Sequence, residues 1–339
     1  MEMLSIDVWQ HVFEFACTDG GRTAAALSRI SKAVQRISAP FRFYSVELHS
    51  LKQVQKFLTA YEAALAAASE AQSDPPHVRH LRLAFLPGET DMFVLGPSFH
   101  FRDFHSWQGV KVEWNARFVE LMTRLFALIG PDLKTMTILQ NHEILLPYVR
   151  ATFPNLRELT LLDEDRMFLR SELKPDGWAE PSDKDFYSAG PPPNKDELAA
   201  SPIFPALERL HLIEGNWQDT LPLWVHAAPR LAHLRLSSTK AESCEALRNT
   251  LQDSASFKAL RTVIVSPQSG KDAALADASL EAIRDISTIR PTIRLVTLPG
   301  AQHRLPEKYW YDWPSQQWRA RAVGEEGPWV TSGADEEKR

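Results

Sequence analysis

Two histidines and an aspartate lie close together at His100, Asp103 and His105, and they are the side chains whose types and spacing best suit chemistry. Two histidines and one carboxylate can hold iron or zinc. Spacing this loose also occurs in many loops that bind nothing, and a plain loop is the commoner interpretation. We therefore predict a chain without a metal or other cofactor, with metal binding at these residues as the alternative.

The sequence contains none of the common catalytic motifs. It has no Gly-x-Ser-x-Gly elbow, no phosphate-cradling glycine loop and no Cys-x-x-Cys pair. Cys17 and Cys244 stand far apart, and two such cysteines do not make a disulfide framework, which fits a reducing compartment. These observations indicate a non-catalytic protein of the cytoplasm or nucleus.

Length and charge narrow the class further. A chain of 339 residues is long enough for two domains and a large core. The net charge of -5 is mild, and its sign is wrong for a nucleic-acid binder. No apolar run approaches the length of a membrane span, and the N-terminus lacks the basic region of a signal peptide. We therefore expect protein partners, and neither nucleic acid nor a membrane.

Residues 4–48 have the pattern of three short helices followed by a strand. Apolar residues of the first helix recur every three or four positions and cover more than one side, so this helix must bury two faces or offer one to a partner. The Asp-Gly-Gly sequence at 19–21 predicts a turn, and Pro40 ends the second helical run. The apolar residues are Leu4, Ile6, Val8, Trp9, Val12, Phe13, Phe15 and Ala16 in the first helix, and Leu27, Ile30, Val34 and Ile37 in the second run.

This segment resembles an F-box, the module that docks a protein onto the Skp adaptor of a cullin-based ubiquitin ligase. Asp7, Val8 and Trp9 follow the family's order of acidic, aliphatic and aromatic residues. Ser31 and Lys32 match the end of its second motif. The resemblance implies a helical domain over residues 1–48 whose adaptor-binding residues are Leu4, Val8, Trp9, Val12, Phe13, Leu27 and Ile30.

The segment departs from the family pattern at two places. Ser5 stands where F-boxes usually have a proline, although a serine can cap the helix instead. The tryptophan often found shortly after the lysine is absent. The alternative interpretation is an ordinary helical cap on a repeat domain.

The rest of the chain repeats a unit of the form Leu-x-x-Leu-x-Leu, preceded by a turn. The clearest copies are FPNLRELTL, FPALERLHL and APRLAHLRL, which begin at residues 153, 204 and 228. Weaker copies lie at 77–83, 132–138, 257–265 and 291–298. Helical runs are predicted between them, at 51–70, 116–128, 144–151, 221–227, 241–251 and 278–286.

The repeat spacing predicts the architecture. Successive copies are 23 positions apart from Leu133 to Leu156 and 24 apart from Leu207 to Leu231, within the leucine-rich-repeat range. We expect an α/β fold in which residues 49–300 form an irregular leucine-rich-repeat-like solenoid with a parallel sheet. Leu159, Leu210 and Leu234 should then be equivalent and buried, whereas Arg157, Glu158, Glu208, Arg209 and His233 should tolerate substitution.

Two long segments interrupt the repeats, near 87–113 and 163–203. Long loops in a compact fold are usually functional or disordered. The first is rich in aromatic residues and is the expected place for target contacts. The candidate target-binding residues are Phe99, Phe101, Phe104 and Trp107.

The C-terminal segment concentrates tryptophan, at Trp310, Trp313, Trp318 and Trp329. We predict that residues 301–330 fold back as a cap on the open end of the solenoid, with a ligand groove as the alternative. The stretch WPSQQWRARAVGEEGPW is similar to the ending common in F-box and repeat proteins of mushroom-forming fungi. Residues 331–339 are polar, and we expect them to be disordered.

These features lead to two functional hypotheses. In the first, the chain is the substrate-recognition subunit of a Skp–cullin–F-box E3 ubiquitin ligase, with the Skp adaptor, a cullin held through it and an unknown target protein as partners. In the second, it is a ligase-independent repeat scaffold that binds other proteins. Ser5 in place of proline favours the second hypothesis.

Overall fold

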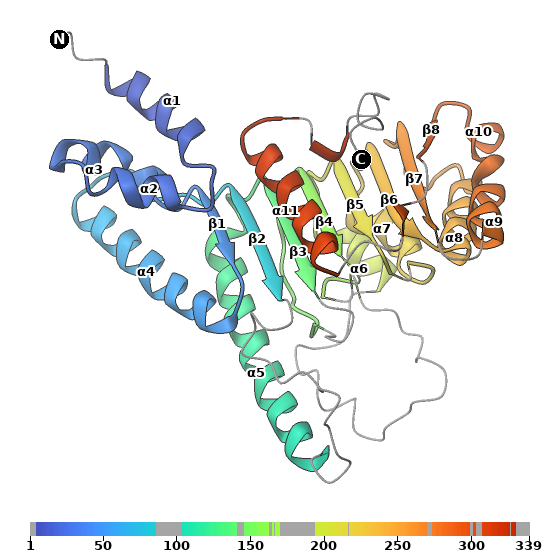
Figure 1. Cartoon of the computed structure of the whole chain (residues 1–339), viewed down its shortest axis with the longest axis horizontal. Coiled ribbons are helices and arrows are strands. Elements are labelled where there is room, and N and C mark those ends of the chain that lie inside the picture. The colour runs from blue at the N-terminus through green and yellow to red at the C-terminus, as the bar shows by residue number, and fades with distance from the viewer. Residues whose placement is uncertain are drawn as a thin grey trace.

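The computed structural model describes residues 5–85, 104–140, 146–162, 165, 167–169, 194–215, 217–269, 273–298, 301–302, 307–325 and 327–329. Within these residues the chain has an α/β fold in which helices alternate with the strands of one parallel sheet (Figure 1). The strands are β1 Ser45–Leu48, β2 His80–Phe85, β3 Thr135–Gln140, β4 Glu158–Leu162, β5 Arg209–Ile213, β6 His233–Thr239, β7 Thr262–Ser269, β8 Arg294–Thr297 and β9 Ala301–Gln302.

The strands lie side by side in the order in which they occur in the chain, from β1 to β8, and β9 pairs with β7. Each pair is parallel, so every connection must return across one face of the sheet. The connecting helices from α4 to α9 gather on that face (Figure 1). The helices are α1 Ile6–Ala16, α2 Arg22–Leu27, α3 Lys32–Ser38, η1 Ala39–Phe41, α4 Leu51–Glu70, α5 Phe104–Ile129, α6 Lys195–Ala200, α7 Leu221–Ala227, α8 Ala241–Gln252, α9 Ala273–Arg284, α10 Ile286–Ile289, α11 Glu307–Ala322 and η3 Gly327–Trp329.

The predicted copies of the repeat all end in strands of this sheet. Leu159, Leu210 and Leu234 stand at equivalent register positions of β4, β5 and β6, and each is fully buried. Because side chains alternate along a strand, these leucines point to the same face as the connecting helices. They belong to one apolar core that runs from Phe43 to Ile293 between the sheet and the helices.

The N-terminal segment forms the expected three short helices and a strand. Gly20 and Gly21 both have positive φ, at 75° and 94°, which explains the Asp-Gly-Gly sequence between α1 and α2. The Asp19 carboxylate accepts hydrogen bonds from the backbone N–H and the hydroxyl of Thr23 and so covers the start of α2. Ser31 caps α3 by accepting from the backbone N–H of Val34 at 3.2 Å. Local sequence signals therefore determine this module.

Several helical segments differ from the sequence prediction. Residues 146–151 form no helix, and the Val149 N–H donates instead to the Met167 carbonyl, far along the chain. Helix α5 begins at Phe104, inside the stretch 87–113 that was expected to be a loop. Helix α9 begins at Ala273 and is followed by α10, where one helical run over 278–286 was expected.

The C-terminal segment does not take the expected position at the open end of the sheet. Helix α11 lies across the face opposite the connecting helices (Figure 1). Its side chains and those of η3 contact strands from β1 to β6. The last strand of the row, β8, keeps Arg294 and Thr297 exposed. We call residues 307–325 and 327–329 the strap, because they run over the sheet face and do not cap its end.

Candidate functional site

Helix α1 has two apolar faces with different surroundings. One face carries Phe13, which is 2% exposed and packs with Cys17, Ala24 and Tyr44 in a small core of the N-terminal module. The other carries Val8, Val12 and Phe15, spaced by four and three positions along the helix. A helix that buries one apolar face and exposes another is typical of a surface that awaits a partner.

The exposed face of α1 carries three large apolar side chains. Val8, Val12 and Phe15 are 44%, 45% and 60% exposed, and Ile30, between α2 and α3, is 65% exposed. Val323 is the other large apolar side chain that is exposed in the part of the chain the structure describes, so four of the five lie in this module. Scattered exposed apolar residues are ordinary, but a stripe along one helix is not.

The structure divides the predicted adaptor-binding residues into two groups. Val8, Val12 and Ile30 are exposed, whereas Trp9 and Leu27 are half-buried against the module core and Phe13 lies inside it. Leu4 lies outside the described residues. Phe15 was not among the predicted residues, although it continues the stripe of Val8 and Val12 at helical spacing.

The module is joined to the sheet without a linker. The Tyr44 hydroxyl donates to Glu14 of α1 at 2.8 Å, and the Ser45 hydroxyl donates to the Thr18 carbonyl at 3.2 Å. The backbone N–H of His80, on β2, donates to the carbonyl of Tyr44. The hydrogen bonds on either side of β1 therefore fix the exposed face of α1 relative to the sheet.

The predicted target-binding residues are only partly described. Phe99 and Phe101 lie outside the described residues, and Phe104 and Trp107 belong to the first two turns of α5. His100 and Asp103 of the possible metal set also lie outside, while His105 belongs to α5. Among the described residues, no three histidine, cysteine or carboxylate side chains gather as metal ligands would.

A second surface of interest is the face of the sheet under the strap, where charged residues are buried. Arg82 of β2 forms an ion pair with the Oε1 atom of Glu47 on β1. The guanidinium of Arg319, on the strap, lies 3.6 Å from the Oε2 atom of Glu47. Burial alone would raise the pKa of Glu47, but a hydrogen bond from His49 and the charges of Arg82 and Arg319 lower it to about 2. The carboxylate therefore stays ionised beneath the strap.

Glu158 on β4 is the second buried carboxylate of this face. The Nε atom of Arg321 lies 3.0 and 2.8 Å from its two oxygens, and Arg209 lies 3.6 Å away. Glu158 was predicted to tolerate substitution, yet it is only 5% exposed. The strand alternation points it away from Leu159, and the strap covers it on that side.

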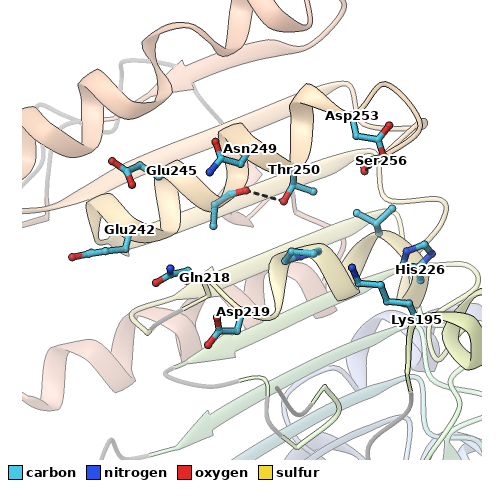
Figure 2. Close-up of a pocket in the computed structure, with 13 residues that line it drawn as sticks. Lys195, Gln218, Asp219, His226, Glu242, Glu245, Asn249, Thr250, Asp253 and Ser256 are labelled. Atoms are coloured by element: carbon cyan, nitrogen blue, oxygen red, sulfur yellow. Dashed lines mark hydrogen bonds between the residues drawn. The ribbon is translucent and has the colours of Figure 1, made fainter. Parts of the chain in front are cut away.

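A groove on the helix side of the molecule has a volume of about 510 Å³ (Figure 2). Glu242, Glu245 and Asn249 of α8 face Asp219 across it, and His226 of α7 lies at one end. The chain itself satisfies several of its polar groups. Thr250 donates to the Ala246 carbonyl at 2.8 Å, and the Asp253 carboxylate accepts from the Ala255 N–H and the Ser256 hydroxyl.

Neither cysteine has the character of a nucleophile. Both are free and buried. Burial, with the charge of Asp19 as a smaller cause, raises the pKa of the Cys17 thiol to about 11, and burial raises that of Cys244 to about 12. A thiol that stays protonated at neutral pH is a poor nucleophile.

Two wider observations complete the description. In the described part of the chain, no helix is both long and apolar enough to cross a membrane. Comparison of the chain with protein-family models, with curated proteins and with solved structures finds no match.

Proposed function

We propose that the chain is a non-catalytic, substrate-recognition subunit of a Skp–cullin–F-box E3 ubiquitin ligase. In this proposal the N-terminal helices dock on the Skp adaptor and the repeat region binds a target protein. The observation that carries it is the pair of apolar faces on α1, one closed in the module core and one exposed. Adaptor contacts are proposed for Val8, Val12, Phe15 and Ile30, with Trp9 and Leu27 at their margin.

The repeat region is proposed to be an irregular leucine-rich-repeat-like solenoid. The order of the strands along the sheet and the alignment of Leu159, Leu210 and Leu234 support this proposal. A strand-and-helix unit buries its leucines only against its neighbours, so the units must stack in order. The ligase subunit would then act by proximity, since holding a target near the charged enzyme raises its effective concentration.

The rigid joint at β1 supports this role. A target held by the sheet region keeps a fixed position relative to the adaptor only if the module cannot swing. The bonds from Tyr44 to Glu14 and from Ser45 to the Thr18 carbonyl tie β1 to α1 directly.

Co-expression with a Skp adaptor tests the proposal. The chain should co-purify with the adaptor, and the double variant Val8→Asp, Val12→Asp should lose at least roughly a hundredfold in affinity, because it would bury unpaired charges in the interface. Its melting temperature should match that of the parent, since both positions are exposed in the isolated chain. Capture of the double variant as efficiently as the parent would refute the docking assignment.

Val323→Asp provides the matched control. Val323 is 44% exposed, like Val8, but it lies at the end of the strap, far along the chain from the module. This variant carries the same type of substitution and should be captured as well as the parent. A loss of capture in the control would point to a general effect of added charge.

The ligase-independent scaffold is the second candidate. Ser5 favours it, because Ser5 occupies the N-cap position of α1 without a side-chain capping hydrogen bond, where an F-box would usually place a proline. Isolation of the endogenous protein, probed for the adaptor, separates the two. Target proteins without adaptor would support the scaffold.

A further inference from the structure

The strap holds the sheet face through charge pairs. Arg321 forms a forked contact with Glu158, and Arg319 approaches Glu47. On the sheet side, Arg82 bonds the Ser315 hydroxyl and Arg235 bonds the Pro328 carbonyl. This interface contains several ion pairs and polar hydrogen bonds, whereas the opposite face of the sheet packs apolar side chains.

Trp313 anchors the strap on an apolar patch in the middle of the sheet face. Trp313 packs on Ala84, Leu139, Leu162 and Ile213, which stand at paired register positions on four neighbouring strands. The Arg235 guanidinium lies 5.5 Å from the centre of the Trp313 ring, a cation–π distance. The strap thus presents the Trp313 ring and, six residues later, the first of two arginines, and Trp318 and Trp329 also lie against the sheet.

The fit between strap and sheet is incomplete. In the described part of the chain, the indole N–H groups of Trp313, Trp318 and Trp329 are buried without hydrogen-bond partners. On the sheet side, His211 is 1% exposed, and its Nδ1 has no partner although Nε2 is bonded to Ser237. A buried polar group without a partner is costly, so the strap stabilises the folded chain less than its area suggests.

A small gap between the strap and the sheet is a second sign that the two surfaces do not fit completely. It is lined on the sheet by Thr137, Glu158 and Thr160, and on the strap by Gln317 and Trp318. Permanent interfaces usually pack as densely as a protein interior. A polar, gapped interface is suited to exchange of one segment for another.

We propose that the sheet face of β1–β6 is a docking site for a target segment that carries an aromatic residue and two arginines, and that the strap is its built-in competitor. The target's arginines would replace Arg321 and Arg319 on Glu158 and Glu47, and its aromatic ring would replace Trp313. A polar group on the target could also bond the free Nδ1 of His211. The inference rests on the proposed function only in that the segment belongs to a ligase target.

A peptide with the sequence of residues 307–329 serves as the probe. Labelled peptide should bind the full-length Arg319→Ala, Arg321→Ala chain at least tenfold more tightly than the parent chain, because the variant's own strap competes less. A peptide with both arginines replaced by alanine should bind at least tenfold more weakly than the unmodified peptide, and so should the unmodified peptide when Glu158→Gln is added to the variant chain. Equal binding to parent and variant chains, or no binding to either, would overturn the proposal.

Hydrogen exchange on the unmodified chain keeps the test independent of the folding of any variant. The amides of 307–322 should exchange at least a hundredfold faster than those of β5, since the strap opens while the sheet stays folded. Exchange of the strap and β5 at the same rate would show that the strap leaves only on global unfolding and would refute its role as a competitor.

Adaptor capture, measured on the same samples, separates this inference from the proposed function. Val8→Asp, Val12→Asp should abolish capture and leave peptide binding unchanged. If the parent chain fails to capture adaptor while the peptide behaves as expected, the ligase proposal fails and the docking site stands. If the parent chain captures adaptor but the peptide does not bind as expected, the docking site fails and the ligase proposal stands.

Discussion

The two faces of the parallel sheet are covered in different ways. On one face, Leu159, Leu210 and Leu234 pack against the connecting helices in one continuous apolar core. On the other, Glu47 and Glu158 lie under the arginines of the strap. One set of strands therefore supports two kinds of interface, and the alternation of side chains keeps them apart.

The two interfaces differ in how precisely the segment that covers the sheet must be positioned. Apolar burial is non-directional and roughly proportional to area, so any well-shaped helix can contribute. Buried charges require partners at defined positions, and a misplaced partner leaves an uncompensated charge. The apolar face should therefore dominate the stability of the fold, while the charged face should respond to pH and to single substitutions that break a pair.

The largest effect is expected on the apolar face. Leu210→Ala should lower the free energy of unfolding by about 2–5 kcal/mol, because Leu210 is fully buried and its loss leaves a cavity. Denaturant melts measure this change. Thr160→Val, on the opposite face of the neighbouring strand, is the matched control and should cost less stability than Leu210→Ala, because valine fills nearly the same volume as threonine and leaves no cavity. Equal losses of stability in the two variants would show that the apolar and the charged face of the sheet contribute alike.

Acid should weaken the charged face in particular. Burial, with the charges of Lys134, Arg321 and Arg79, lowers the pKa of His80 to about 4, against an ordinary value near 6.5. Above pH 6.5, His80 is neutral in both the folded and the unfolded chain and the free energy of unfolding is unaffected by it. As the pH falls from 6.5 toward 4, the unfolded chain binds a proton at His80 that the folded chain excludes, so the free energy of unfolding decreases. The loss should reach roughly 3 kcal/mol.

His80→Asn tests the source of that pH dependence. Denaturant melts of this variant between pH 7 and pH 4 should show a shallower decline in stability than those of the parent. Parallel curves for the two proteins would show that His80 does not carry the effect.

Breaking one charge pair should have a smaller effect. Arg321→Ala should destabilise by about 1–3 kcal/mol, since among the described residues Glu158 would keep the more distant Arg209 as its charged partner. Arg319→Ala should cost no more than about 1 kcal/mol, because the Arg319 side chain is half exposed and surface pairs contribute little. Thermal and denaturant melts of both variants decide the order, and a larger loss for Arg319→Ala would contradict it.

The smallest effect on stability is expected at the exposed stripe of α1. Val8→Ser should change the free energy of unfolding by less than about 0.5 kcal/mol, as is usual for surface positions. The same change should measurably weaken adaptor capture if this stripe is the docking surface. A marked drop in the melting temperature would instead place Val8 in a structural contact.

Much of the fold could be predicted because its signals are local. The helical stripe at residues 51–70 coincides with α4, and Ser50 caps that helix by accepting from the Gln53 N–H. The alternation around Leu159, Leu210 and Leu234 indicated strands with one apolar face, and the register confirms their equivalence. Propensity, capping and period depend on residues a few positions apart, which a sequence displays directly.

What covers the second face could be learned only from the tertiary structure. Glu158 was predicted from the sequence to tolerate substitution, and its partner Arg321 lies 163 positions later in the chain. Phe13 and Val8 looked alike on a helix that is apolar all round, yet only Phe13 enters the module core. The sequence determined which side chains share a face. Which of those faces met another segment of the chain was decided by contacts between distant residues, whose free energy depends on geometry in three dimensions and not on spacing along the chain.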